Sequence, residues 1–244
     1  MLKKIIRKIF GKNLIFNFRL LYFKFTGNFF TNKPIGKQND YQELYKNYVE
    51  KIKEYNFITN NFNNEEIEFI NKLALKTQVV KKKSMLSWIH GFVIMKTLNE
   101  YIKDNYKGKI EILETGTAAG FSSVIMSYVL SKSKLDYKIH TIDLIPHHRE
   151  IYWNRISDHT VGKLSRENLL GEYSNYIKNI NFINGVSKKL IKKGLHIDRV
   201  NFAFIDGSHE YEDAKMEFEF VDRRNSKGDI IILDDYTPGK FDGI

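Results

Sequence analysis

Three carboxylates and one histidine close two apolar runs in the C-terminal part of the sequence. Asp206 ends the run VNFAFID and is followed by Gly, Ser and His209, while Asp234 and Asp235 end the run DIIILDD. Like charges brought together are unfavourable unless a cation neutralises them. Because oxygen ligands without nitrogen or sulfur suit a hard ion, these residues predict a Mg²⁺ site formed by the three aspartates.

His209 lies three residues beyond Asp206 and has the chemistry of a general base. An imidazole with an ordinary pKa near 6.5 can accept a proton from a hydroxyl, and a divalent ion makes that hydroxyl more acidic. We therefore predict that His209 activates an acceptor hydroxyl. The alternative is that one aspartate caps a loop and His209 is a surface residue. Glu210, Glu212 and Asp213 are expected only to form the acidic first turn of a helix.

A second group of residues suited to ligand binding is the turn ETGTAAG, which follows an apolar run and opens a helical pattern. Glycines at its third and seventh positions allow close approach of the backbone and packing of the helix on a sheet. The spacing differs from the G-x-G-x-x-G of dinucleotide sites. We predict that the cofactor contacts the turn and the start of its helix, at Glu114, Gly116, Thr117, Ala118, Gly120 and Ser122.

The acids near this turn indicate which cofactor it binds. Glu114 beside the turn would repel an anionic diphosphate, and it suits a cation such as the sulfonium and amino groups of S-adenosylmethionine. Asp143 ends the next apolar run, 27 residues beyond Gly116, where a carboxylate can accept hydrogen bonds from both ribose hydroxyls. The alternative is a generic glycine turn with a solvated aspartate.

The elements that must position these residues alternate along the second half of the chain. Helical patterns are expected at 122–130, 188–193 and 211–225, and over most of 147–178 apart from a loop near 158–163. Strands are expected at 110–115, 138–144, 180–184, 200–206 and 229–235. Such alternation predicts an α/β fold with a doubly wound, mostly parallel Rossmann-like sheet. Ligands of such sheets bind beyond the carboxyl ends of the strands, where four of the five predicted strands place an acid.

The first half of the chain is predicted to be helical. Apolar side chains at helical spacing indicate helices at 40–60, 64–77 and 84–106, the second with an N-cap at Asn64. We expect a basic extension at residues 1–39, a helical cap at 40–84 and a cofactor-binding domain at 85–244.

The motifs ETGTAAGFSS, TIDL, FIDGSHEYE and IILDDY together resemble the class I S-adenosylmethionine-dependent methyltransferases. The resemblance covers about residues 85–244 and is greatest to the branch with macrocin-type sugar O-methyltransferases and cephalosporin hydroxylase relatives. It implies that Val186 and Ser187 lie near the adenine, that Asp206 also contacts the cofactor, and that 158–170 is a substrate-side insertion whose His159 and Arg166 could meet the substrate.

The family sheet has seven strands in the order 3-2-1-4-5-7-6, whereas only nine residues follow Asp235 here. The last two strands would then be missing, and the strand at 229–235 would be an exposed apolar edge. We expect a shortened form of a longer protein. The alternative is that another segment or a second subunit covers the edge.

The net charge of +10 is concentrated at the N-terminus. Residues 1–39 hold nine Lys and Arg and no acid, whereas residues 109–244 hold 19 Lys and Arg against 20 Asp and Glu. Cations and apolar residues interleave at helical spacing in the first ten residues, which suits a helix on an anionic membrane surface or one that packs on protein. Lysines outnumber arginines 31 to 8, which disfavours nucleic acid as the partner. The chain has no cysteine and no run long enough for a secretory signal or a membrane span.

These features predict a cytoplasmic, Mg²⁺-assisted O-methyltransferase that uses S-adenosylmethionine and acts on a hydroxyl of a sugar or another small polar metabolite. Homo-oligomers and contact with the inner membrane surface through residues 1–30 are compatible with it. One alternative is a non-catalytic protein of the same fold that binds a membrane or a partner. A nicotinamide-dependent enzyme is a further alternative that the turn spacing disfavours.

Overall fold

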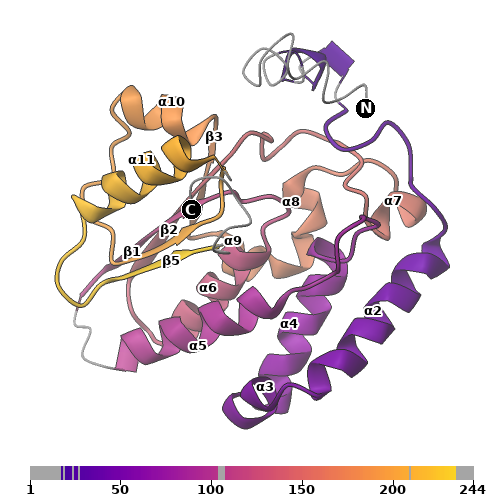
Figure 1. Ribbon diagram of the computed structural model, residues 1–244, viewed down its shortest axis with the longest axis horizontal. Coiled ribbons are helices and arrows are strands. Elements are labelled where there is room, and N and C mark those ends of the chain that lie inside the picture. Colours follow the sequence, from indigo (N-terminus) through magenta and orange to yellow (C-terminus); the bar gives the residue numbers. More distant parts are fainter. Residues whose placement is uncertain are drawn as a thin grey trace.

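The computed structural model describes residues 18, 20–23, 25, 26, 28–103, 108–208 and 210–234, and this part of the chain holds one parallel sheet between helices (Figure 1). The sheet order is β3-β2-β1-β4-β5, and all neighbouring strands are parallel. The strands are β1 (Ile110–Thr115), β2 (Tyr137–Asp143), β3 (Ile180–Asn184), β4 (Phe202–Ile205) and β5 (Ile230–Leu233). The predicted α/β fold with a Rossmann-like sheet is confirmed.

Helices cover both faces of the sheet because successive side chains of a strand point to opposite sides. In β1, Ile112 faces the layer of α5 (Ile89–Lys103) and α6 (Phe121–Lys132), and Leu113 faces the layer of α10 (Ser187–Lys192) and α11 (Tyr211–Asp222). Figure 1 shows the two layers on opposite sides of the strands. Since both faces are buried, the strands read as apolar runs rather than as alternating patterns.

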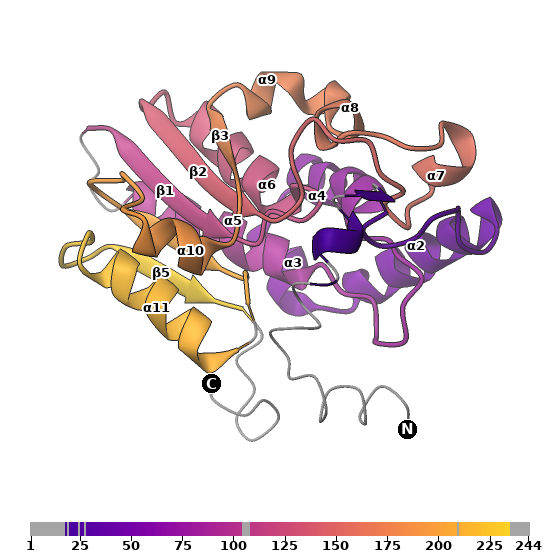
Figure 2. The same cartoon turned by 90° about the horizontal axis from the view of Figure 1, so that it is seen from above.

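The N-terminal helices share the core of the sheet domain instead of forming a separate one. Helices α2 (Gln38–Lys53), α3 (Asn56–Asn61) and α4 (Asn64–Thr77) bury residues such as Tyr41 and Ile70 in the same cluster as Ile112. Trp88, just before α5, links α5 to α4, because its ring is fully buried and its Nε1 donates to Asn71 Oδ1 of α4 at 2.9 Å. Figure 2 shows α2–α4 as a bundle beside the sheet.

Several predicted boundaries of these helices are wrong. The helix expected at 40–60 is broken after Lys53, and the helix expected from residue 84 begins at Ile89. The cap of α4 is Asn63 rather than Asn64. Asn63 Oδ1 accepts from the Glu66 amide, and Glu66 Oε2 accepts from the Asn63 amide, both at 3.0 Å. This capping box decides the first residue of the helix.

The connection between β2 and β3 is less helical than expected. It holds four short elements, α7 (Ser157–Thr160), α8 (Arg166–Leu169), the 3₁₀ turn η1 (Gly171–Tyr173) and α9 (Ser174–Ile177), and α7 overlaps the loop expected near 158–163. Buried polar groups hold the segment instead of helical repetition. Asp158, which is 3% exposed, accepts from the amides of Trp153 at 3.0 Å and Asn154 at 2.7 Å.

Only part of the basic extension at residues 1–39 (the head) lies in the described residues, and the cations of its first ten residues lie outside them. Phe23 is 5% exposed and packs edge-on against Phe29 in a cluster with Trp153 and Ala119. The guanidinium of Arg149 donates to the Phe23 carbonyl at 3.1 Å. The head is thus anchored to the β2–β3 connection. None of the described helices has the length and hydropathy needed to cross a membrane.

Within the described residues β5 is the last strand of the sheet order, as expected. Leu233 is exposed, whereas the three isoleucines before it are partly buried. The residues after Asp234 lie outside the described part of the chain, so a shortened sheet stays a prediction.

Candidate functional site

The register of the strands brings predicted residues together at the carboxyl ends of the strands, which form one edge of the sheet. Ile142 of β2 and Ile205 of β4 both pair with Thr115 of β1, and Ile205 pairs with Leu233 of β5. The residues that follow these positions are Gly116, Asp143, Asp206 and Asp234. The expected convergence at the carboxyl ends of the strands is therefore present in the structure.

Gly116 allows close approach of the protein's own backbone, whereas close approach of a ligand was expected from the sequence. Its φ is +89°, and a Cβ at this position would lie 2.1 Å from the Asp206 carbonyl oxygen. The Asp206 amide also donates to the Thr115 carbonyl at 3.0 Å. Gly116 thus allows the turn after β1 to pack directly against the end of β4, which fixes where Asp206 stands relative to the turn.

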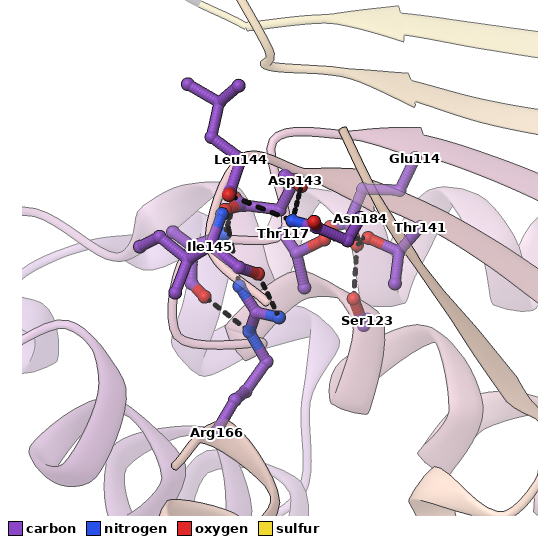
Figure 3. A network of polar contacts seen from close by, with 10 residues as sticks. Glu114, Thr117, Ser123, Thr141, Asp143, Leu144, Ile145, Arg166 and Asn184 are labelled. Atoms are coloured by element: carbon purple, nitrogen blue, oxygen red, sulfur yellow. Dashed lines mark hydrogen bonds and ion pairs between the residues drawn. The ribbon is translucent and has the colours of Figure 1, made fainter. Parts of the chain in front are cut away.

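Asp143 and Arg166 hold the middle of the turn (Figure 3). The Ala118 amide donates to Asp143 Oδ2 at 2.8 Å, and the Ile145 amide donates to Asp143 Oδ1 at 2.6 Å. Arg166 donates from Nε to the Ala118 carbonyl at 2.7 Å and from Nη1 to the Ile145 carbonyl at 3.1 Å. Burial raises the pKa of Asp143 above its ordinary value, although the Arg166 charge and the two amides act in the opposite direction.

Asn184 links this group to β3. Its Nδ2 donates to the carbonyls of Asp143 at 3.1 Å and Leu144 at 2.9 Å. The side chain of Asn184 is exposed at the edge of the sheet. The ends of β2 and β3 are thereby fixed side by side next to the turn.

Glu114 is placed differently from the expectation of an acid beside an open turn. Its side chain is fully buried and accepts hydrogen bonds from Ser122, Ser123 and Thr141. Burial raises the pKa of Glu114, which these hydroxyls only partly offset. Because side chains alternate along β1, Glu114 points toward α6 rather than along the sheet edge. The expected attraction to a cationic ligand is therefore not supported at this position, and Ser122 is used inside the protein.

The remaining turn residues have mixed placements. Thr117 is 2% exposed, and its hydroxyl hydrogen-bonds that of Thr141 at 2.5 Å. Gly120 has a φ of +94°, and a Cβ there would lie 2.7 Å from Leu170 Cδ1. Of the predicted turn residues, Ala118 is the exposed one.

Ser187 and Glu217 form a contact that the sequence did not indicate. Val186 and Ser187 are half-buried after β3, and the Ser187 hydroxyl donates to the fully buried carboxylate of Glu217 in α11. Thr115 Oγ1 donates to the same carboxylate at 2.9 Å, and burial raises the pKa of Glu217. The signal in the sequence is the spacing of Glu217 with Phe220 and Val221, which share the buried face of the helix.

Asp213 also does more than form an acidic first turn. Its carboxylate accepts from Lys188 Nζ at 2.6 Å and from Ser208 Oγ at 3.1 Å. It therefore ties the loop after β4 to α10.

Asp206 and Asp234 are neighbours at the ends of β4 and β5. The Asp234 amide donates to the Ile205 carbonyl at 3.0 Å, which continues the parallel ladder by one residue. The predicted third ligand, Asp235, and the predicted base, His209, both lie outside the described residues. Within the described part of the chain, no group of three His, Cys, Asp or Glu is arranged to hold a metal ion.

The two residues expected to meet a substrate have structural contacts. His159 Nε2 lies 3.1 Å from the Ile35 carbonyl, and its ring packs near that of Tyr41. Arg166 is 1% exposed and contacts the turn, as described above. The guanidinium of Arg166 does not point outward from the insertion, because it hydrogen-bonds the Ala118 and Ile145 carbonyls near the ends of the strands.

A family model for a methyltransferase domain matches residues 113–236, which is just over half of the chain. The chain belongs to this methyltransferase family. The match contains the turn after β1, the ends of β2 to β5 and the loop after β4. The predicted class, an S-adenosylmethionine-dependent methyltransferase, is confirmed.

Solved structures with a similar fold include other methyltransferases. The O-methyltransferase NovP is 18% identical with a TM-score of 0.48, over 82% of this methyltransferase and 85% of NovP. The S-adenosylhomocysteine-bound PaMTH1 of Podospora anserina is 14% identical with a TM-score of 0.45, over 84% and 73%. CalS11, a TDP-rhamnose 3′-O-methyltransferase of calicheamicin biosynthesis, is 14% identical with a TM-score of 0.43, over 86% and 84%. No curated protein matches the sequence significantly.

Proposed function

We propose that this methyltransferase transfers the methyl group of S-adenosylmethionine to a hydroxyl of a small polar acceptor, such as a sugar. The observation that carries the proposal is the pairing of the glycine turn with Asp143, through the 2.8 Å hydrogen bond from the Ala118 amide. A carboxylate oxygen has room for more than one donor, so Asp143 can hold the turn and still accept the ribose hydroxyls. The methyl group would then lie over the ends of β1 and β4.

Asp206 and Asp234 support a role for a hard cation on the acceptor side. The backbones of the two aspartates are neighbours there because their strands are paired in register, and oxygen ligands suit Mg²⁺. Asp206, Asp234 and Asp235 would hold the ion, which when bound would lower the pKa of an acceptor hydroxyl. His209 is proposed as the group that accepts the hydroxyl proton.

Calorimetric titration with S-adenosylhomocysteine tests the cofactor site. The wild type is expected to bind it, and Asp143→Asn is expected to weaken binding because the amide loses the charge and one acceptor. Asp158→Asn is the matched control, since Asp158 is also a buried acid that accepts backbone amides. No binding by folded wild-type protein would contradict the proposal.

Replacement of the acids tests the cation. Methyl transfer to sugar acceptors should lose its dependence on added Mg²⁺ in Asp234→Ala, while Asp222→Ala, at the far end of α11, should behave as the wild type. Unchanged Mg²⁺ dependence in Asp234→Ala would remove this residue from the metal site. An unaltered rate in His209→Ala would likewise remove the proposed base.

The head supports a second proposal, contact with the inner surface of an anionic membrane by an otherwise cytoplasmic protein. Phe18, Leu21, Tyr22 and Phe25 have helical spacing and are 50% to 79% exposed, while Phe23 anchors the segment. Residues 1–39 carry nine cations and no acid. Exposed apolar side chains combined with positive charge favour an anionic lipid surface.

Co-sedimentation with vesicles tests this contact. Binding to vesicles containing phosphatidylglycerol should be greater than to phosphatidylcholine alone, and Phe25→Asp should weaken it. Phe57→Asp is the control, because Phe57 is an exposed phenylalanine on α3, outside the head. If Phe25→Asp leaves vesicle binding unchanged but alters the oligomeric state, the exposed apolar side chains of the head contact a second copy of the chain instead.

A further inference from the structure

Arg166 is a buried cation that the proposed reaction does not use. Its side chain is 1% exposed and comes from α8 in the connection between β2 and β3. Taking a guanidinium out of water costs free energy unless partners compensate for it. Its partners are two backbone carbonyls and one carboxylate, all at the edge of the sheet where the cofactor is proposed to bind (Figure 3).

Two arms of the guanidinium donate hydrogen bonds to separate carbonyls, and the third faces a carboxylate. Nε donates to the Ala118 carbonyl at 2.7 Å, and Nη1 donates to the Ile145 carbonyl at 3.1 Å. Nη2 lies 3.3 Å from Asp143 Oδ1 and has no hydrogen-bond partner of its own among the described residues. A planar fork can reach acceptors on three sides, which the single ammonium group of lysine does not reproduce.

Ala118 is the residue that this arrangement constrains. Its φ is +45°, in the left-handed region that costs a residue with a Cβ about 1–2 kcal/mol. Such a conformation persists where the surroundings fix it. Here the Ala118 amide is held by Asp143 and its carbonyl by Arg166, so the same ion pair holds the peptide groups on both sides of one strained residue.

We propose that Arg166 is the positioning residue of the cofactor site, which together with Asp143 clamps Ala118 in its left-handed conformation and thereby shapes the turn for the cofactor. The inference rests on the proposed binding of the cofactor at Asp143. Arg166 itself lies beneath the edge and acts through Asp143 and the turn. Cofactor affinity should therefore depend on the guanidinium fork and not only on a positive charge.

The first test measures S-adenosylhomocysteine affinity in Arg166→Lys and Arg155→Lys. Arg155 is the matched control, because it is a buried arginine of the same connection whose guanidinium donates to the Thr77 and Asn154 carbonyls, remote from the turn. Loss of hydrogen bonds to a charged group predicts a decrease of about tenfold to a hundredfold in Arg166→Lys. Arg155→Lys should stay within about threefold of the wild type.

The second test asks whether the effect acts through the strain at Ala118. Glycine adopts a left-handed φ without the Cβ penalty, so Ala118→Gly should restore up to about tenfold of the affinity lost in Arg166→Lys. In the wild-type background the same substitution should change affinity little. A residue that only stabilises the fold would give no such local recovery.

A pH series supplies a third readout. Arg166 opposes the rise in the pKa of Asp143 that burial causes. In Arg166→Gln, which lacks the charge, affinity should therefore begin to fall at a higher pH than in the wild type as the solution is acidified. Arg155→Gln should keep the wild-type profile.

If the Arg166 variants do not fold, hydrogen exchange of the wild type tests the positioning role of Arg166 instead. Bound S-adenosylhomocysteine should slow exchange at the Ala118 and Ile145 amides and across 164–170 together. Protection of the turn without protection of 164–170 would overturn the positioning role. Wild-type affinity in Arg166→Lys would also overturn it alone, whereas a wild type that binds no S-adenosylhomocysteine would overturn the proposed function as well.

Discussion

The contact between Gly116 and the end of β4 can be tested by adding one methyl group. Gly116→Ala places a Cβ 2.1 Å from the Asp206 carbonyl oxygen, and the backbone at this position has a φ of +89°. Two costs therefore add. The left-handed conformation costs alanine about 1–2 kcal/mol, and an overpacked contact costs typically about 1–3 kcal/mol.

Gly162→Ala separates the two costs. Gly162 has a similar φ of +97°, but a Cβ there would have nothing within 4 Å. The control should therefore lose only the conformational cost of about 1–2 kcal/mol, and Gly116→Ala should lose about 2–5 kcal/mol in all. The difference between the two variants measures the packing of the turn against Asp206.

Equilibrium unfolding in urea gives both values, provided that near- and far-ultraviolet circular dichroism report coincident transitions. Gly116→Ala should also weaken binding of S-adenosylhomocysteine, because the turn or Asp206 must move to admit the methyl group. Equal losses of unfolding free energy in Gly116→Ala and Gly162→Ala would refute the close contact. Wild-type cofactor affinity in Gly116→Ala would refute its link to the site.

Three further substitutions have defined outcomes. Burial raises the pKa of Glu217 above its ordinary 4.5, so the folded state keeps this proton to a higher pH than the unfolded chain and loses stability as pH rises through that window. Glu217→Gln should remove this loss in urea unfolding measured as a pH series, and an unchanged pH slope would contradict it. Asn63→Ala removes the cap of α4 and should cost about 0.5–2 kcal/mol in the same assay; a loss no larger than that of Asn60→Ala, an exposed asparagine of α3, would contradict the capping role. Phe23→Ala should speed tryptic cleavage of the head, while the unfolding free energy of the sheet domain should fall less than it would for the loss of a residue in its core. Unaltered cleavage would mean that Phe23 is not the anchor.

The sequence was sufficient to predict the strands, because parallel strands buried on both faces are apolar runs with little ambiguity. Each of the five predicted strands is present, and the order of the sheet places Gly116, Asp143, Asp206 and Asp234 at one edge. Helix ends were predicted less well. The periodicity of 40–60 continues across the break after Lys53, since apolar spacing does not reveal where the backbone turns.

The roles of individual acids could not be predicted from their position at a strand end. Glu114 is the last residue but one of β1 and Asp143 is the last residue of β2, yet hydroxyls of the α6 layer enclose Glu114 whereas Asp143 contacts the turn. Alternation does not separate them, because Glu114 pairs in register with Thr141 and Asp143 lies two residues further along β2, so both side chains point to the same face of the sheet. The difference is position along the strand: Asp143 lies beyond the last paired residue of β1 and so contacts the turn, and this register is not visible in the sequence. The partner of Asp143 was equally hidden, because Arg166 lies 23 residues later in a connection that was expected to be mostly helical and is irregular in the structure.

The acids near the strand ends therefore form two sets with different chemistry, and Glu217 belongs to them because it reaches the end of β1 from α11. Glu114 and Glu217 are fully buried, and their carboxylates are used by internal hydroxyls, with pKa values that burial raises. They hold β1, α6 and α11 together, and a cationic ligand gains little from them. Asp143 is paired with Arg166, which suits neutral donors such as ribose hydroxyls better than a cation. The cation site proposed at the ends of β4 and β5 would then have to supply the negative charge for a sulfonium or a divalent ion. Asp234→Ala therefore tests the proposed charge of the site more directly than a substitution of the buried Glu114 does.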